Sequence, residues 1–226
     1  MDEEAKAVQE VAKATGKVVD ATREAGGFIA RFVSGSLEQG MGIFEDRLRY
    51  ARWERQIRLM QRAEEFLHQV GMSEPTRAVP LKLAVPLLQG ASLEDDDELQ
   101  DRWATLLVNA GNAAFAFEIR RAHLAILEQI DSLEAKSLDV IYALPYEQMQ
   151  HAGVLTADLP HSVRIPSENE HGSVEPTREV VLALSNLARL GCIRAGSTMG
   201  GGEYFGRINP TVLGASFVQA CRLPTA

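Results

Sequence analysis

A run of carboxylates ahead of a tryptophan is the first place in this sequence where side chains could hold a metal or move a proton. The stretch SLEDDDELQDRW covers residues 92–103 and supplies Glu94, Asp95, Asp96, Asp97, Glu98 and Asp101. A calcium-binding EF-hand loop alternates its oxygen ligands around a central glycine and ends on a glutamate, and this stretch has no such arrangement. Acids in the first turn of a helix interact favourably with the helix dipole, at ~0.3–1 kcal/mol each. The cluster therefore predicts the start of a helix and no metal site.

The other residues with chemical potential do not form a catalytic pattern. The glycines of MGGGEYFG (199–206) would need to follow a strand and open a helix to cradle phosphate, but strands are expected on both sides. No serine stands in a nucleophile-elbow context. Neither the histidines of the C-terminal half nor the two cysteines have metal-ligand spacing: His151, His161, His171, Cys192 and Cys221. We expect no catalytic residue, no cofactor and no small-molecule substrate, so the chain is predicted not to be an enzyme.

A stripe of arginines is the one basic patch in the sequence. It lies on a helix predicted over residues 43–70 and consists of Arg47, Arg49, Arg52, Arg55, Arg58 and Arg62. Two interpretations stay open. The stripe could be a solvated face that pairs with the acids at 94–101, or it could contact an acidic partner or an anionic membrane surface, at roughly 1 kcal/mol per basic residue near the lipid headgroups.

The C-terminal third resembles a winged helix-turn-helix. A helix over 133–144, a helix that ends in LSNLARLGCI and a glycine-tipped hairpin occur in that order. In DNA-binding members the second helix enters the major groove. The candidate DNA contacts are Arg178, Asn186, Arg189, Arg194 and Arg207. Because Glu175, Glu179 and Glu203 lie among them, the net positive charge is low, which favours a structural or protein-contacting wing and leaves DNA binding as the alternative.

The composition of the chain limits the classes of protein to which it can belong. The chain has 226 residues, 46% of them hydrophobic, and a formal net charge of −8. A uniformly acidic chain is poorly suited to wrapping nucleic acid. The start MDEEAKAVQE does not resemble a signal peptide, and no apolar run approaches the roughly 20 residues that span a bilayer. We therefore expect a cytoplasmic protein, with peripheral contact at the inner membrane surface left open.

The N-terminal segment has a heptad pattern that indicates a helix packed against another helix or another copy of the chain. The recurring positions are Val8, Thr15, Thr22 and Ile29, and, three residues on, Val11, Val18, Ala25 and Phe32. Glycines and threonines weaken this seam.

Three segments follow from these patterns: an N-terminal helical arm (1–42), a central helical bundle (43–130) and a winged-helix-like unit (131–226) with a long loop at about 146–177. In the helix over 43–70 the expected buried stripe is Tyr50, Trp53, Ile57, Met60 and Leu67. Further helices are expected over 81–91, from Leu99 to Gly111, and over 117–130. A capping box joins Asp131 and Glu134, and a last helix has Asn209 as N-cap and Pro210 as its first residue. The predicted fold class is mainly α, with a C-terminal α+β unit.

The sequence also resembles the bacterial abortive-infection alpha (Abi-alpha) family over roughly residues 40 to 215. The resemblance lies in RYARWERQIRLMQRAEEFL, PTRAVPLKLAVPLLQGASLEDDDELQDRWATLLVNA, RRAHLAILEQIDSLEAKSLDVIYAL and LSNLARLGCI, and its most distinctive positions are Leu99, Asp101, Trp103 and Asn109. It implies protection of bacterial populations against phage, and it brings no assigned catalytic residue or cofactor. We therefore expect a non-enzymatic interaction or effector protein that self-associates through its arm or binds another protein. A winged-helix transcriptional regulator and a membrane-surface effector acting through residues 18–62 are the alternatives.

Overall fold

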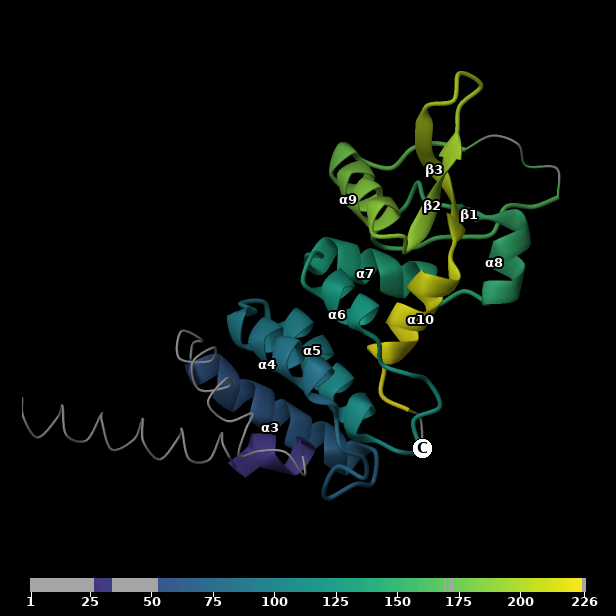
Figure 1. Cartoon of the computed structure of the whole chain (residues 1–226). Helices are drawn as coiled ribbons and strands as arrows, with labels where there is room; N and C mark the ends of the chain where they lie inside the picture. Colours follow the sequence, from purple (N-terminus) through teal and green to yellow (C-terminus); the bar gives the residue numbers. More distant parts are fainter. Residues whose placement is uncertain (1–26, 34–52, 169, 171–172, 225–226) are drawn as a thin grey trace, which may run out of the picture. The chain divides into compact units, whose positions relative to one another are not determined.

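The structure is a computed structural model that describes residues 27–33, 53–168, 170 and 173–224 (Figure 1). It consists of two compact units. The first takes the described residues up to Phe115 together with residues 223–224, and the second is Ala116–Arg222. The boundary expected between 130 and 131 thus falls inside the second unit. The two units are described separately below.

Three helices and one helical turn build the described part of the first unit. They are α3 (Trp53–Gln69), α4 (Leu81–Leu93), α5 (Asp97–Gly111) and the helical residues 27–32. The three long helices pack on one another in pairs (Figure 1). Helix α5 is the central one, because its apolar side chains Trp103, Leu106 and Leu107 are at most 1% exposed. Pro86 lies inside α4 without ending it.

Local sequence signals mark the start of α5 and the end of α3. The Asp96 side chain caps α5 by accepting the N–H groups of Glu98 and Leu99, both at 2.9 Å. Helix α3 ends at Gly71, which has a φ of 74°. The Gly71 and Met72 N–H groups then donate to the carbonyls of His68 and Leu67, which is the Schellman pattern that follows a left-handed residue.

The buried face of α3 differs from the expected one. It consists of Leu59, Ala63, Phe66 and Leu67, whereas Ile57 and Met60 are only half-buried. The expectation followed a single stripe, but α3 packs against both α4 and α5, and its arginines take the side toward the start of α5. The residues before 53 that were expected to belong to this helix, Tyr50 among them, and the side chain of Trp53 lie outside the described part.

The second unit combines short helices with a small sheet. Its elements are α6 (Arg121–Leu127), α7 (Ser132–Ile141), α8 (Tyr146–Ala152), β1 (Val154–Leu155), α9 (Arg178–Arg189), β2 (Ile193–Ser197), β3 (Glu203–Pro210) and α10 (Val212–Ala220). The sheet is antiparallel in the order β1-β3-β2. Val154 pairs with Ile208 and Ile193 with Pro210. The mainly helical fold with a small β-containing unit near the C-terminus confirms the predicted fold class.

Local sequence signals again explain the elements. The capping box between Asp131 and Glu134 is present in both directions, at 2.9 and 2.8 Å. Gly191, with a φ of 76°, ends α9 with a second Schellman pattern, in which Cys192 N–H donates to the Leu187 carbonyl at 2.9 Å. Helix α9 is followed directly by the β2–β3 hairpin, as expected, and Gly201 at its tip has a φ of 81°.

Three expectations for this unit were wrong in detail. The helix expected over 117–130 begins at Arg121, because Arg120 is extended. The loop expected at 146–177 contains α8 and β1, which are held by the fully buried Met149 and Val154. Helix α10 is capped by Thr211 and not by Asn209, since β3 continues through Pro210 and the Thr211 side chain accepts the Gly214 N–H at 2.9 Å.

Candidate functional site

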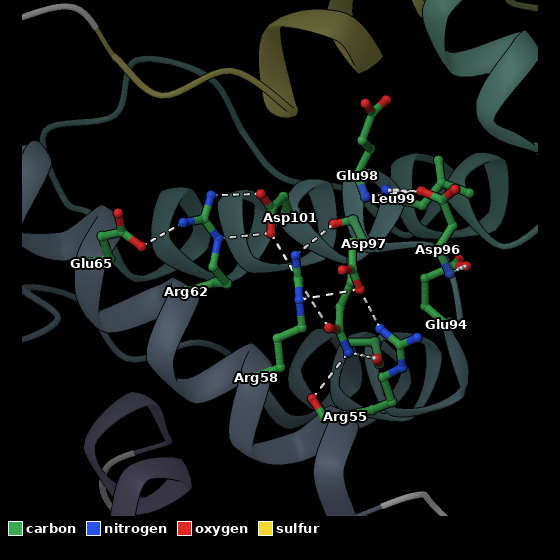
Figure 2. A network of polar contacts seen from close by, with 12 residues as sticks. Arg55, Arg58, Arg62, Glu65, Glu94, Asp96, Asp97, Glu98, Leu99 and Asp101 are labelled. Carbon is green, nitrogen blue, oxygen red and sulfur yellow. Dashed lines mark hydrogen bonds and ion pairs between the residues drawn. The ribbon is translucent and has the colours of Figure 1, made fainter.

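The densest cluster of charged side chains in the described part lies between α3 and the start of α5. Arg55, Arg58 and Arg62 share one side of α3, at spacings of three and four residues. Figure 2 shows their guanidinium groups pointing from α3 toward the carboxylates of α5. We call this set, with Asp97 and Asp101, the arginine–aspartate clasp.

Asp101 is the centre of the clasp. Arg62 binds it with two nearly parallel hydrogen bonds, Nη2 to Oδ2 at 2.6 Å and Nε to Oδ1 at 2.8 Å. Arg58 Nη1 reaches the same carboxylate at 2.9 Å. This bidentate geometry is the strongest form of an arginine–carboxylate pair, and its hydrogen bonds raise the pKa of Arg62.

Asp97 forms the second half of the clasp. Its Oδ1 atom lies 2.5 Å from Arg55 Nη1 and 3.3 Å from Arg58 Nε. Arg55 also donates to the backbone carbonyl of Asp95. Arg58 therefore bridges both aspartates, and the three arginine side chains are only 22–29% exposed.

A buried amide lies beneath the clasp. Gln100 has no exposed surface; its Nε2 donates to the carbonyls of Arg55 and Ala91, at 3.0 and 2.9 Å, and its Oε1 accepts from Arg58 at 2.9 Å. One side chain thus joins α3, α4 and α5. Gln100 was not among the residues singled out from the sequence, because a glutamine among acids gives no signal of burial.

The acids of the run at 94–101 serve the start of α5 and the contacts of the clasp. Asp96 caps α5, Asp97 and Glu98 stand in its first turn, and Asp97 and Asp101 bind arginines. The interpretation as a helix start is confirmed, and so is the pairing of the arginine stripe with the acids for Arg55, Arg58 and Arg62. Arg47, Arg49 and Arg52 lie outside the described residues. Among those that are described, no group of three or more His, Cys, Asp or Glu side chains is placed to hold a metal ion.

The four distinctive positions of α5 all have places in the folded unit. Leu99 and Trp103 are in the core, at 4% and 1% exposure. Asp101 is in the clasp. Asn109 is fully buried, and its backbone carbonyl accepts from Arg77 Nη2 at 3.3 Å, while Arg77 Nε donates to the Ala110 carbonyl at 3.0 Å. Arg77 therefore caps the C-terminal end of α5, where carbonyls lack helical partners.

The candidate DNA contacts are divided between exposed and internally bonded positions. Arg178 and Arg194 are exposed. Asn186 instead donates to the Gln129 carbonyl at 2.9 Å and to Glu134 Oε1 at 2.7 Å, and Arg189 holds Asn186 Oδ1 at 2.7 Å. Arg207 donates to the Ala152 carbonyl, 3.0 Å from its Nε.

A serine–histidine contact in the second unit has the wrong polarity for a nucleophile and its base. His123 is 1% exposed, its Nδ1 accepts the Arg120 N–H at 3.3 Å, and its Nε2 lies 3.1 Å from Ser216 Oγ. Because Nδ1 is the acceptor, the neutral ring carries its proton on Nε2 and donates it to Ser216. A base in a catalytic pair accepts the serine proton instead. The contact therefore secures α6 to α10.

The buried thiol of Cys192 is not activated either. Burial raises its pKa to about 12, so the thiolate that acts as a nucleophile is scarcely populated near neutral pH. Tyr142 shares this environment: its hydroxyl donates to the Cys192 carbonyl at 2.6 Å, and burial raises its pKa to about 12. Both groups pack the junction of α7, α10 and the sheet.

One hollow opens on the first unit, between residues 28–29, α3 and α4, and its volume is ≈ 10 Å³. That is room for about one water, whereas small-molecule sites usually have about 300–1,000 Å³. No helix in the described part of the chain is long and apolar enough to cross a membrane.

The comparisons with known proteins agree with the resemblance drawn from the sequence. Residues 54–221, which include α5 and every element of the second unit, match the family described as abortive infection alpha. No curated protein and no solved structure matches the chain. Because the match covers most of its length, the chain belongs to the abortive infection alpha family.

Proposed function

We propose that this protein is a non-enzymatic abortive-infection effector that works in the bacterial cytoplasm through protein contacts, chiefly with further copies of itself. Family membership is the observation that carries the proposal. The family description implies defence of a bacterial population against phage, in which the infected cell stops growing or dies.

The use of the polar side chains supports a non-enzymatic role. Arg58, Arg62 and Asp101 neutralise one another in the clasp. His123 donates toward Ser216, and the pKa of Cys192 is far above neutral. Groups that hydrogen-bond within the fold in this way stabilise it and offer little to a substrate.

The N-terminal arm supports self-association. Its heptad positions run from Val8 to Phe32, and a seam of this kind is completed by a second helix. Light scattering should therefore give a larger mass for the full chain than for a chain that lacks residues 1–26, which keeps the packed segment 27–33. Equal monomeric masses for both would contradict self-association.

Phage challenge tests the defence role directly. Bacteria that express the chain should yield fewer plaques from at least one phage of a broad panel. Their cultures should also survive infection at low phage-to-cell ratio and collapse at high ratio, because protection requires the loss of infected cells. A chain with the core substitution Leu107→Asp is the unfolded control. Equal plaque numbers with and without the wild-type chain across the panel would contradict the proposal.

The hairpin after α9 favours one second candidate, a DNA-binding regulator. Arg178 and Arg194 are exposed on α9 and β2 and would carry the phosphate contacts. A gel-shift at about 50 mM salt, with DNA from upstream of the gene, tests it, because phosphate contacts are strongest at low salt. Loss of the shift in Arg178→Ala and Arg194→Ala would support regulation, and no shift with the wild-type chain would exclude it.

Flotation with anionic vesicles tests the membrane-surface alternative. A wild-type chain that does not float with the vesicles would contradict it.

A further inference from the structure

Residues 27–33 lie in a groove of the first unit in the way that a short bound peptide would. Residues 27–32 are helical, and Phe28, Phe32 and Val33 are 3%, 1% and 4% exposed. The rings of Phe28 and Phe32 stand one helical turn apart, with their centroids 5.1 Å from each other. An amphipathic helix that binds in a groove is anchored in this manner, by apolar side chains at positions i and i+4.

The floor of the groove has room for the second ring because position 111 has no side chain. A Cβ at Gly111 would lie 3.1 Å from two ring carbons of Phe32 and 3.1 Å from the Pro75 side chain. The Gly111 carbonyl accepts the N–H groups of Thr76 and Arg77, each at 2.9 Å, so the chain before α4 is fixed against the end of α5. The bonds that shape this floor are therefore made without the segment that lies on it.

The rim of the groove contacts a backbone carbonyl and a positive charge of the segment. Val79 N–H donates to the Phe32 carbonyl at 2.9 Å. Arg31 Nη2 lies 2.5 Å from Glu64 Oε1 on α3, and these two side chains are 33% and 49% exposed. The groove therefore recognises two aromatic side chains one turn apart and a basic side chain directly before the second of them.

The walls of the groove lie inside the family match, and its occupant lies outside it. The match covers residues 54–221, whereas the segment 27–33 precedes them. The wall residues are Leu59, Glu64, Pro75, Val79, Leu88 and Gly111. We call this set the aromatic groove. The part of the chain that makes it a family member thus includes the groove without the segment, which indicates that the two are separable.

The segment fits the groove incompletely and is too short to be a stable helix by itself. A hollow of ≈ 10 Å³ remains beside Ile29, against Leu59 and Leu88. Residues 27–32 make a helix of six residues, and isolated helices below about 12–15 residues are marginal in water. The order of the segment therefore depends on the groove. Its advantage over a free peptide is its effective concentration as part of the same chain.

We infer that the aromatic groove is a peptide-binding site that residues 27–33 of its own chain close. The partner is an amphipathic helix of another protein, with aromatic side chains at positions i and i+4 and an arginine or lysine at i+3. That helix replaces Phe28, Phe32 and Arg31 at the same contacts. The inference adds a second kind of partner to the proposed function and does not depend on self-association.

Binding of a labelled peptide to the full-length chain tests the inference. The peptide has the sequence of residues 27–33, and fluorescence anisotropy measures its binding. The variant F28A/F32A, checked for folding by circular dichroism, should bind the peptide at least about tenfold more tightly than the wild type, whose groove is occupied. A peptide with alanine at both aromatic positions should bind neither chain. Absence of binding to the folded variant at ~1 mM, the scale of effective concentration of a tethered segment, would overturn the inference.

A milder variant keeps the test valid if loss of both rings unfolds the first unit. Arg31→Glu places a glutamate against Glu64, which weakens the docking of the segment and leaves both rings in place. This chain should bind the native peptide at least about threefold more tightly than the wild type does. Arg121→Glu, a reversal at an exposed position of α6, is the matched control and should leave the affinity unchanged. Equal affinities of the wild type and the Arg31→Glu chain would speak against a closed groove.

A charge exchange locates the bound peptide in the groove. In the variant F28A/F32A/E64R, the native peptide brings its arginine against the introduced arginine, whereas a peptide with Arg31→Glu meets an opposite charge. The second peptide should bind this variant at least about threefold more tightly than the native one, and F28A/F32A should show the reverse order. The same order for both chains would place the peptide elsewhere and overturn the inference. These failures would leave the plaque and light-scattering tests of the proposed function unaffected.

Discussion

Gly90 of α4 lies directly against the indole of Trp103 in α5. A Cβ at position 90 would be 2.6 Å from both Cη2 and Cζ2 of that ring, a separation at which atoms overlap. The glycine is therefore required by the close approach of the two helices. Trp103, at 1% exposure, is the largest fully buried side chain among the described residues and one of the positions that carry the family resemblance. The pair explains why a glycine is tolerated inside a helix.

We expect Gly90→Ala to destabilise the chain by about 1–3 kcal/mol, because a methyl group must displace a packed ring. The loss should appear in urea unfolding followed by circular dichroism. Gly27→Ala is the matched control, since a Cβ at that helical position meets nothing within 4 Å. The double variant G90A/W103F should lose less than the sum of the single losses, because the smaller ring leaves space for the methyl group. Additive losses would contradict a direct clash.

The clasp should contribute measurable coupling between Arg62 and Asp101. Both side chains are less than one third exposed, at 29% and 28%, and their contact is bidentate. We expect a double-mutant cycle with Arg62→Ala and Asp101→Ala to give about 1 kcal/mol at low salt, above the typical exposed pair. The value should fall in 1 M NaCl, where the Debye length is about 3 Å. The pair of Arg62 with Glu65, whose side chain is 53% exposed, is the control and should give about 0.3–0.5 kcal/mol. Equal coupling energies for the two pairs would show that the bidentate geometry adds nothing.

Two residues of α9, Asn186 and Arg178, should differ in how much they contribute to stability. Asn186 Nδ2 bonds the Gln129 carbonyl and the carboxylate of Glu134, whereas Arg178 is exposed. We expect Asn186→Ala to cost about 1–3 kcal/mol of unfolding free energy, since it leaves a buried carboxylate short of a donor. Arg178→Ala should change stability by less than about 0.5 kcal/mol. Thermal unfolding of the two variants checks this, and equal stability losses would contradict it.

Sequence patterns predict the elements that have strong local signals. The capping box at Asp131 and Glu134, the glycine stops at Gly71 and Gly191, and the apolar periodicity of α5 and α9 each depend on neighbouring residues, so they can be read without the fold. Helix α8 was missed because YEQMQHA buries only Met149, too little for a helical stripe. The Asn209–Pro210 pair looks like a helix start, but pairing of Ile193 with Pro210 extends β3 and moves the cap to Thr211.

The contacts of the arginine–aspartate clasp were predictable from the sequence only in part. Opposite charges on two predicted helices indicate that they pair, and Arg55, Arg58 and Arg62 share a face by spacing alone. The choice of Asp101 as the carboxylate shared by two arginines depends on the packing of α3 against α5, which is a tertiary property. Gln100 and Asn186 look like surface residues in sequence, because burial of a single polar side chain leaves no periodic signal. Their roles required the structure.

His123 should make the chain less stable in mild acid. Burial, reinforced by the nearby Arg120 charge, lowers the pKa of His123 in the folded state below its usual value of about 6.5. Below that pH the unfolded chain binds a proton that the folded chain does not, so stability rises with pH and falls as the pH is lowered through about 6.5.

We therefore expect the wild type to lose more stability than His123→Asn between pH 7.5 and 5.5, by at most about 1.4 kcal/mol, measured by urea unfolding at each pH. Asparagine keeps an oxygen that can accept the Arg120 N–H but has no titrating group. The buried carboxyl of Glu134 acts in the opposite sense, because burial raises its pKa and its contribution to stability is lost as the pH rises. Both chains carry Glu134, so it cancels in the difference between them. Parallel pH dependences of the two chains would show that His123 is protonated as readily inside the fold as outside it.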